Sequence, residues 1–291
     1  MKVLVLGING LIGSSIFRVL SKDQELDVYG TLRSAKLKNY FKLELHKKIF
    51  SDIDVFLPNI LDRLLERFST GPDYIINCIG VTKHNDEIKD FNKTIKVNSI
   101  LPHQINNLIK KTSTRLIHIS TDCVFSGKRG FYTEDDPRDA TDIYGKSKSI
   151  GEDLDGNSIV LRTSTIGHEL IHKHGLLEWF LNLNDKCQGF QRAYFSGLPT
   201  VCIGDIIKNL VIKNKIKGGI YNVSSKRINK YDLLNIIKII YMRDIEIIPN
   251  NDFIIDRSLD GSKFYKVSGY VPDEWENMIK KMFDDKRDNY V

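Results

Sequence analysis

Short apolar runs rich in valine, isoleucine and leucine alternate along the first half of the chain with stretches whose apolar residues recur at helical spacing. The apolar runs predict buried β-strands over residues 2–6, 26–32, 74–78, 115–119 and 158–162. The stretches between them predict helices over residues 11–21, 58–68, 87–110 and 142–154. This alternation is typical of an α/β protein, in which a doubly wound parallel sheet carries helices on both faces and each crossover is right-handed.

The pattern changes after residue 163. Helical stretches then dominate, over residues 175–183, 203–213, 230–242 and 272–282, with short strands expected at 220–223 and 245–248. We expect residues 1–163 to form a first domain. Residues 164–291 are expected to form a smaller, mainly helical lobe at the carboxyl ends of its strands, with an approximate boundary that the chain crosses again.

Composition narrows the class of protein. The 291 residues are 41% apolar and 27% charged, which excludes a disordered chain and allows a sizeable core. The net charge is +6, and because the basic residues are scattered, a phosphate-bearing small molecule is a better partner than nucleic acid. The four cysteines form no CxxC pair or zinc spacing, and no long uncharged apolar stretch occurs, so we expect a cytoplasmic protein without a metal site or a membrane span.

A glycine-rich turn follows the first predicted strand and opens the first predicted helix. Its residues are Gly7, Ile8, Asn9, Gly10, Leu11, Ile12 and Gly13. Glycine is required where the chain turns sharply and where the backbone approaches a pyrophosphate, and a helix N-terminus attracts phosphate. The GxxGxxG spacing at this place in a βαβ pattern predicts dinucleotide binding in a Rossmann-type domain; a structural tight turn is the alternative.

The end of the second predicted strand decides which dinucleotide binds. An NAD-binding protein usually has an acidic residue there, which accepts a hydrogen bond from the ribose 2′-hydroxyl. This chain has Arg33 and then Ser34, a guanidinium and a hydroxyl that suit a 2′-phosphate. We therefore expect NADPH as the coenzyme, with NADH as the second possibility. The alternative is that Arg33 and Ser34 belong to a solvated basic loop that binds no coenzyme.

Tyr144 and Lys148 are spaced i, i+4, on one face of a predicted helix. A free phenol titrates near 10, so proton transfer at neutral pH benefits from the nearby lysine. The fifth predicted strand ends at Ser120 and Thr121, where either hydroxyl could polarise a substrate carbonyl. A tyrosine–lysine pair of this spacing is common on helix surfaces, so the strand-end hydroxyls strengthen the interpretation.

Together these motifs resemble the extended short-chain dehydrogenase/reductases, and within them the dTDP-4-dehydrorhamnose reductases. The similar segments are STDCVFSG at 120–127, YGKSK at 144–148 followed by IGE at 150–152, LRTS at 161–164, SGLPT at 196–200 and DRSL at 256–259. The resemblance implies that Thr121, Tyr144 and Lys148 are catalytic. It implies that Gly7, Gly10, Gly13, Arg33, Asp54, Cys78, Ile79 and Gly80 line the coenzyme. Asp54 would accept from the adenine amino group, unless it is only a polar loop residue.

Two positions depart from that branch. Cys123 replaces the usual tyrosine of STDYVF, and Thr165 stands where an aromatic residue usually follows RTS. Both are expected near the sugar, so the substrate can differ from dehydrorhamnose. From the second lobe, Arg257 is expected to bind the diphosphate of a sugar nucleotide; a surface salt bridge is the alternative.

Several other residues are better explained by structure than by chemistry. Cys123 is expected to pack rather than act as a nucleophile, because ketone reduction needs no covalent intermediate. The cluster of His168, Glu169, His172 and His174 lacks a metal-ligand motif. The aromatic residues Trp179, Phe180, Tyr194 and Phe195 could stack on a base, but are more often core residues.

The expected function is NADPH-dependent reduction of a 4-keto-6-deoxy nucleotide sugar for surface polysaccharide synthesis. A nucleotide-sugar epimerase with tightly bound NAD is one alternative. A non-catalytic NADP-binding regulatory subunit, as the methionine adenosyltransferase regulatory subunit exemplifies, is another. The expected partner is the nucleotide sugar, without nucleic acid or membrane, and the sequence leaves a homodimer open.

Overall fold

The computed structural model describes residues 1–83, 86–171 and 173–289. A central sheet of seven strands, all parallel, has the order β11-β6-β5-β4-β1-β2-β3. Its strands are β1 (Lys2–Leu6), β2 (Asp27–Thr31), β3 (Ile49–Phe50), β4 (Tyr74–Asn77), β5 (Arg115–Thr121), β6 (Ile159–Thr163) and β11 (Gly219–Asn222). The expected Rossmann-type doubly wound sheet is therefore confirmed.

Helices cover both faces of this sheet. The α-helices are α1 (Leu11–Ser21), α2 (Ile60–Leu65), α3 (Phe91–Ile95), α4 (Leu101–Ile109), α5 (Ile143–Ile150), α6 (Leu176–Leu181), α7 (Thr200–Ile206), α8 (Lys230–Ile240), α9 (Ser262–Ser268) and α10 (Trp275–Asn289). Short 3₁₀ segments are η1 (Ala35–Tyr40), η2 (Leu43–Lys48), η3 (Asp86–Lys89) and η5 (Asp122–Val124), and π-helical segments are η4 (Lys96–Ile100) and η6 (Ile207–Lys213).

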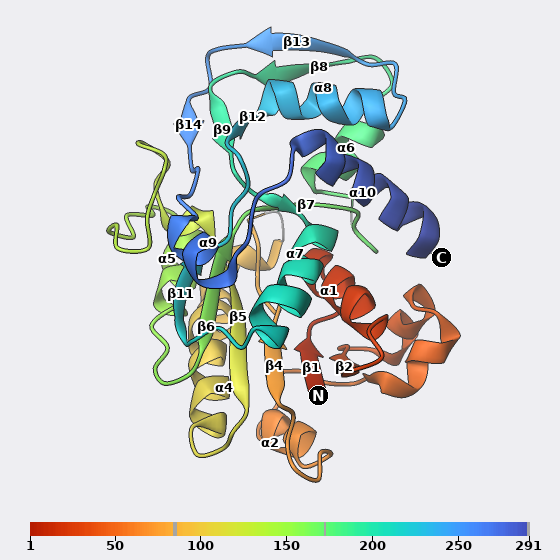
Figure 1. Cartoon of the computed structure of the whole chain (residues 1–291), viewed down its shortest axis with the longest axis vertical. Coiled ribbons are helices and arrows are strands. Elements are labelled where there is room, and N and C mark those ends of the chain that lie inside the picture. The colour runs from red at the N-terminus through yellow and green to blue at the C-terminus, as the bar shows by residue number, and fades with distance from the viewer. Residues whose placement is uncertain (84–85, 172, 290–291) are drawn as a thin grey trace.

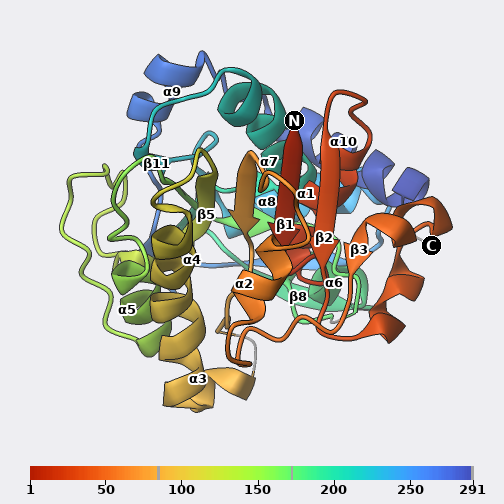
Figure 2. The same cartoon turned by 90° about the horizontal axis from the view of Figure 1, so that it is seen from below.

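Alternate side chains of strand β1 are buried on opposite faces of the central sheet. Val3 and Val5 belong to the core beneath α1, whereas Leu4 and Leu6 belong to the core beneath α2 and α4. All four are at most 1% exposed, which a strand covered on both sides requires. Figure 2 shows α2, α4 and α5 on one side of the strands and α1 and α7 on the other.

The predicted helix over residues 87–110 begins later than expected. The Asp90 carboxylate accepts a hydrogen bond from the Lys93 backbone N–H and caps the helix, which then runs through α3, η4 and α4 to Ile109. The preceding segment forms the separate turn η3. An aspartate followed by a helical pattern is a start signal, so this boundary was readable from the sequence.

Part of the second half returns to the first domain. The expectation that strand 220–223 belongs to the smaller lobe is wrong, because β11 pairs with β6 at the edge of the central sheet. The helix predicted over residues 203–213 is likewise not in the lobe: α7 packs against α1. Periodicity indicates that a segment is a strand or a helix, but not which sheet it joins.

The rest of the second half builds the smaller lobe. Its strands are β7 (Thr165–Ile166), β8 (Lys186–Phe190), β9 (Ala193–Phe195), β10 (Leu198–Pro199), β12 (Ile228–Asn229), β13 (Glu246–Asn250) and β14 (Ile255–Asp256). They form three small sheets, β7 with β10, β8 with β13, and β9 between β12 and β14. In Figure 1 this lobe lies above the sheet, on the side to which the arrow of β1 points. Within the described ranges, no helix is both long and apolar enough to cross a membrane.

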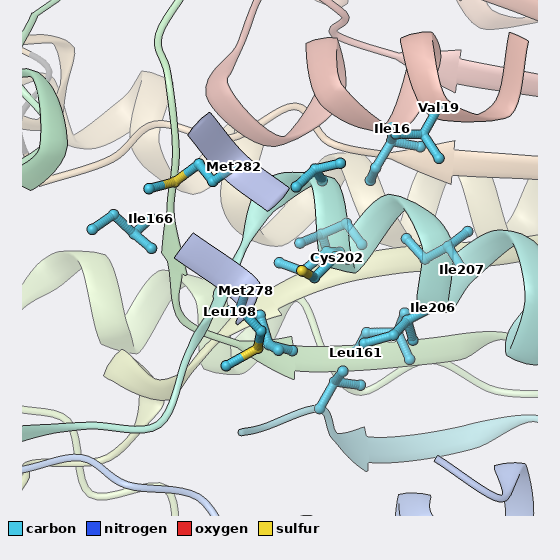
Figure 3. Close-up of a cluster of buried hydrophobic side chains, with 14 of the residues drawn as sticks. Ile16, Val19, Leu161, Ile166, Leu198, Cys202, Ile206, Ile207, Met278 and Met282 are labelled. Carbon is cyan, nitrogen blue, oxygen red and sulfur yellow. The ribbon is translucent and has the colours of Figure 1, made fainter. Parts of the chain in front are cut away.

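One apolar cluster joins the two halves. Figure 3 shows members of one apolar cluster on three neighbouring helices: Ile16 and Val19 on α1, Cys202 and Ile206 on α7, and Met278 on α10. All five are at most 8% exposed. Because this cluster includes residues of both halves, burial of its apolar surface fixes the lobe relative to the sheet.

Candidate active site

The glycine turn has the shape that a dinucleotide needs. Gly7 has a φ of +79°, and a Cβ at Gly13 would lie 2.3 Å from the Gly7 carbonyl oxygen. A larger residue is therefore excluded at Gly13, and it is strained at Gly7. At Gly10 the same carbonyl oxygen, at 3.6 Å, is the only atom of the described residues within 4 Å of a Cβ, so the space that a side chain would fill is open.

The start of helix α1 borders that open space. Gly10 is the N-cap residue and makes no side-chain cap, so the first turn, with Leu11 and Ile12, offers backbone N–H groups and the positive end of the helix dipole. The Gly7 backbone N–H donates to the Thr31 hydroxyl at 3.1 Å, which ties the turn to the end of β2. Asn9 lies at the tip of the turn. These residues fit a coenzyme pyrophosphate.

The predicted adenosine-binding residues lie in loops after β2 and β3. Arg33 is 56% exposed, and its Nη1 lies 3.5 Å from a Glu87 carboxylate oxygen. Ser34 is the N-cap residue of η1, without a side-chain cap. The Asp54 carboxylate accepts a hydrogen bond from the Phe56 N–H at 3.0 Å, which stabilises its own turn. The roles of these three residues toward a coenzyme remain predictions.

The loop after β4 forms a wall beside the glycine turn. A Cβ at Gly7 would lie 2.8 Å from Ile79, and one at Gly13 would lie 3.1 Å from Cys78. Burial raises the pKa of the Cys78 thiol to about 12, with Lys148 acting in the opposite direction. The thiol is therefore neutral and next to the lysine charge. Gly80 follows in the same loop, so the residues expected to form the wall lie beside the glycine turn.

Helix α5 carries Tyr144 and Lys148 toward the end of strand β5. The Tyr144 phenol lies next to the side chain of Thr121, the last residue of β5, which affects the pKa of the phenol. The Lys148 ammonium donates to the Ile119 carbonyl at 2.7 Å and lies 3.3 Å from His118 Nε2. The three residues expected to be catalytic thus meet at the carboxyl end of one central strand.

The two candidate hydroxyls at the end of β5 have different surroundings. The Ser120 hydroxyl donates to Glu152 at 2.5 Å, on the side of the buried ion pair with Arg162. Thr121 instead contacts Tyr144. Because adjacent residues of a strand face opposite sides of the sheet, only the Thr121 hydroxyl lies where a carbonyl could contact the phenol as well.

Burial sets the protonation of the tyrosine and the lysine. It raises the pKa of the Tyr144 phenol above its usual value, although the Thr121 side chain opposes this, so the phenol holds its proton at neutral pH. Burial lowers the pKa of Lys148 to about 8, against the opposing effects of Glu152 and Cys78. Lys148 is then mostly charged at pH 7. A protonated phenol beside a cation is the state that proton donation requires.

Sequence reasoning missed two charged residues near Tyr144, and a third that acts on the neighbouring Asp122 and Cys123. Lys83, in the loop after β4, lies 5.7 Å from the Tyr144 ring centroid and 2.7 Å from an Asp142 carboxylate oxygen. Asp142 also caps α5 by accepting from the Gly145 N–H. Lys230 of the second lobe acts electrostatically on Asp122 and Cys123. Asp142 could have been predicted, because an aspartate before a helical pattern is a common N-cap. No sequence pattern connects Lys83 or Lys230 to Tyr144.

The predicted sugar-binding residues lie in three separate segments. Cys123 follows Thr121, and burial raises the pKa of its thiol to about 12, which leaves it without nucleophilic character at neutral pH. Thr165 lies on β7 and pairs with Leu198. Arg257 donates from Nε to the Phe125 carbonyl at 3.0 Å, so part of its guanidinium supports the loop after η5. Their contact with a substrate remains a prediction.

The histidines and aromatic residues of the second lobe contact neighbouring side chains. His168 Nδ1 lies 2.7 Å from Glu178, and its Nε2 lies 2.7 Å from the Tyr241 hydroxyl. The Glu169 carboxylate accepts from the backbone N–H of His174, and His172 lies outside the described residues. Across the ranges that the structure describes, no three potential metal ligands gather.

The four aromatic candidates differ in their surroundings. Phe180 is fully buried, whereas Trp179 is 41% exposed. The Arg227 guanidinium lies 3.3 Å from the Tyr194 ring centroid, and the Lys230 ammonium lies 3.9 Å from that of Phe195. Phe180 thus belongs to the core, whereas the rings of Tyr194 and Phe195 each lie against a cationic side chain.

Comparison with known proteins identifies what this arrangement is similar to. The model of the family described as RmlD substrate binding domain matches residues 1–287. The spore coat polysaccharide biosynthesis protein SpsK of Bacillus subtilis is 33% identical over 57% of this chain, and the match spans 54%, about half, of that relative. A dTDP-4-dehydrorhamnose reductase of Aggregatibacter actinomycetemcomitans is 24% identical over 97% of this chain and 98% of its own length.

A solved structure shows the same fold. It is the dTDP-4-dehydrorhamnose reductase of Bacillus anthracis in complex with NADP, with a TM-score of 0.78 and 20% identity. The alignment covers 98% of this chain and 99% of that one. At this identity, the likeness establishes the arrangement of strands and helices across both lobes.

Proposed function

The chain belongs to the RmlD substrate binding domain family, and from this premise we propose that it is an NADPH-dependent reductase of a keto nucleotide sugar. A 4-keto-6-deoxy sugar is the proposed substrate, and surface polysaccharide synthesis is the proposed setting. The observation that carries the proposal is the meeting of Tyr144 and Thr121 at the end of β5, with the Lys148 cation beside them. The full-length relative and the spore coat relative are named for the same chemistry and setting.

The chain's own residues have distinct parts in this reaction. The turn Gly7–Gly13 would hold the coenzyme pyrophosphate at the start of α1, and Lys148 would bind the nicotinamide ribose. When bound, the reduced nicotinamide supplies the hydride. Tyr144 donates its phenolic proton to the oxygen of the substrate carbonyl, while Thr121 holds that oxygen with a hydrogen bond. The Lys148 charge stabilises the phenolate that remains.

A direct test offers the purified protein a panel of 4-keto nucleotide sugars with NADPH. We expect mass spectrometry to find a product two mass units heavier than one of them, formed as NADPH absorbance decays. A product of unchanged mass, together with NAD that copurifies with the protein, would show an epimerase instead. Coenzyme binding without any product from the panel would favour a regulatory subunit.

Replacing Arg33 with alanine is expected to weaken NADPH binding about 10- to 100-fold and NADH binding little. The reason is that only NADPH has a 2′-phosphate, and a hydrogen bond to a charged group contributes about 1.5–3 kcal/mol. Titration of each coenzyme into wild-type and variant protein, followed by fluorescence, measures the difference.

A matched control is Arg63→Ala, which removes an exposed arginine from α2. This variant should bind both coenzymes as the wild type does. Equal losses for NADPH and NADH in Arg33→Ala, or a wild-type preference for NADH, would contradict a 2′-phosphate site at Arg33.

A further inference from the structure

Lys230 has an unusual position at the start of helix α8. The preceding residue, Asn229, caps the helix by accepting a hydrogen bond from the Asp232 N–H at 2.8 Å. The strand β12 that leads into the helix pairs with β9, opposite Phe195 and Tyr194. These contacts fix the backbone on both sides of the lysine and place its ammonium 3.9 Å from the Phe195 ring centroid.

The Lys230 ammonium has no oxygen partner within the described part of the chain, either as a hydrogen bond or as an ion pair within 4.0 Å. An ammonium has three N–H donors, and the face of one ring can satisfy only part of that capacity. Burial lowers the pKa of Lys230 to about 8, and the nearby Asp122 and Cys123 only partly offset it. The Lys230 side chain is only partly buried, so its ammonium remains open to a ligand that offers an acceptor.

Asp122 does not serve as that acceptor. One of its carboxylate oxygens accepts a hydrogen bond from the Thr121 hydroxyl at 3.1 Å. Burial raises the pKa of Asp122, opposed first by Arg257 and by hydrogen bonds with Cys123 and Thr121, so the carboxylate is shared among several neighbours. The Asp122–Lys230 attraction is therefore a longer-range effect rather than an ion pair.

The lysine lies on the lobe side of the reacting groups. The Thr121 hydroxyl, which contacts Tyr144, also accepts from the Cys123 N–H at 3.1 Å, and Cys123 is one of the two groups that Lys230 affects electrostatically. Lys148 lies on the other side, against the Ile119 carbonyl and the neutral Cys78 thiol. A substrate whose carbonyl contacts Tyr144 would therefore have Lys148 on the coenzyme side and Lys230 on the lobe side.

We propose that Lys230 binds an anionic oxygen of the substrate on the lobe side of the candidate active site. This inference rests on the proposed function and deepens it, because it adds a requirement for the substrate class. The oxygen belongs to the diphosphate of the nucleotide sugar, which is the anionic group that a 4-keto-6-deoxy nucleotide sugar carries. It presents the acceptors that the three N–H donors lack in the described residues.

The test compares Lys230→Met with Lys230→Arg by isothermal titration in the presence of saturating NADP⁺. Methionine keeps an unbranched side chain against Phe195 and removes only the charge. The probes are dTDP, UDP, dTDP-glucose and UDP-glucuronate. For Lys230→Met we expect about a 10- to 100-fold loss of affinity for the probes that carry the relevant anion, and Lys230→Arg should restore most of it.

The control is Lys238→Met, which removes a lysine two turns along the same helix and should bind every probe as the wild type does. A loss for dTDP and UDP assigns the diphosphate to Lys230, whereas a loss confined to UDP-glucuronate would overturn that assignment. If wild type binds a probe and folded Lys230→Met binds it equally well, the inference is overturned but the proposed function stands. A wild type that binds none of the four overturns the proposed function, and the inference with it.

Discussion

Tyr144→Phe is expected to lower turnover about 10²- to 10⁴-fold, the usual contribution of general acid–base catalysis. Phenylalanine keeps the ring in place on α5 and removes only the phenolic proton, which burial holds on Tyr144 at neutral pH. The open space at Gly10, where we propose that the pyrophosphate binds, is untouched, so NADPH affinity should stay near that of the wild type. Steady-state kinetics and a coenzyme titration on the same preparation measure both quantities.

Two further variants sharpen this test. Tyr221→Phe removes a phenol on β11 whose hydroxyl donates to the Lys217 carbonyl, so turnover should not change. Lys148→Met should lower both turnover and coenzyme affinity, since its ammonium would bind the ribose as well as stabilise the phenolate. More than half of the wild-type turnover in Tyr144→Phe would show that another group donates the proton.

The sequence predicts the central sheet well because its strands are buried on both faces. Such strands are continuous apolar runs, and the predicted limits of β1 are those observed. Strand β3 has only two residues, Ile49 and Phe50, too few for any periodicity to register. Strand β11 is detectable as a strand, but its partner β6 lies 60 residues earlier in the chain, and only tertiary packing decides that pairing.

The candidate site, like the fold, could be predicted from the sequence only in part. Tyr144 and Lys148 could be predicted because a helix brings residues i and i+4 to one face. Thr121 could be predicted because it is the last residue of a predicted strand. Lys83 and Lys230 come from a loop and from the other lobe, and no local pattern links them to the tyrosine. Arg257 shows the converse: its sequence context suggests a ligand, whereas much of its guanidinium bonds to the loop carbonyls of Phe125 and Ser126.

A buried ion pair between Glu152 and Arg162 lies next to the candidate site. Glu152 belongs to the segment IGE that follows Lys148. Glu152 and Arg162 are each 1% exposed. The guanidinium Nη2 donates to Glu152 at 2.8 Å, and Nε lies 3.0 Å from the other carboxylate oxygen. The same carboxylate accepts from Ser120, the residue before Thr121. The Glu152 side chain therefore connects the end of α5 with β5 and β6, next to the hydroxyl of Thr121 that we propose to be catalytic.

Glu152→Ala is expected to lower the free energy of unfolding by about 3–5 kcal/mol, because it leaves a buried guanidinium without its counter-ion. Urea denaturation followed by circular dichroism measures the loss. Asp153→Ala is the matched control: its carboxylate pairs with Arg138 at 2.8 Å but is 60% exposed, so its removal should cost at most about 1 kcal/mol.

The double variant Glu152→Leu with Arg162→Met separates the charge from the packing. Replacing a whole buried ion pair by apolar residues of similar volume is often neutral, whereas removing one partner is costly, so most of the lost stability should return. Turnover should not return with it, because Ser120 would still lack its acceptor and the end of β5 would be less firmly held beside Tyr144. Equal stability of Glu152→Ala and Asp153→Ala would show that Arg162 finds another partner, and that the ion pair does not hold the strand.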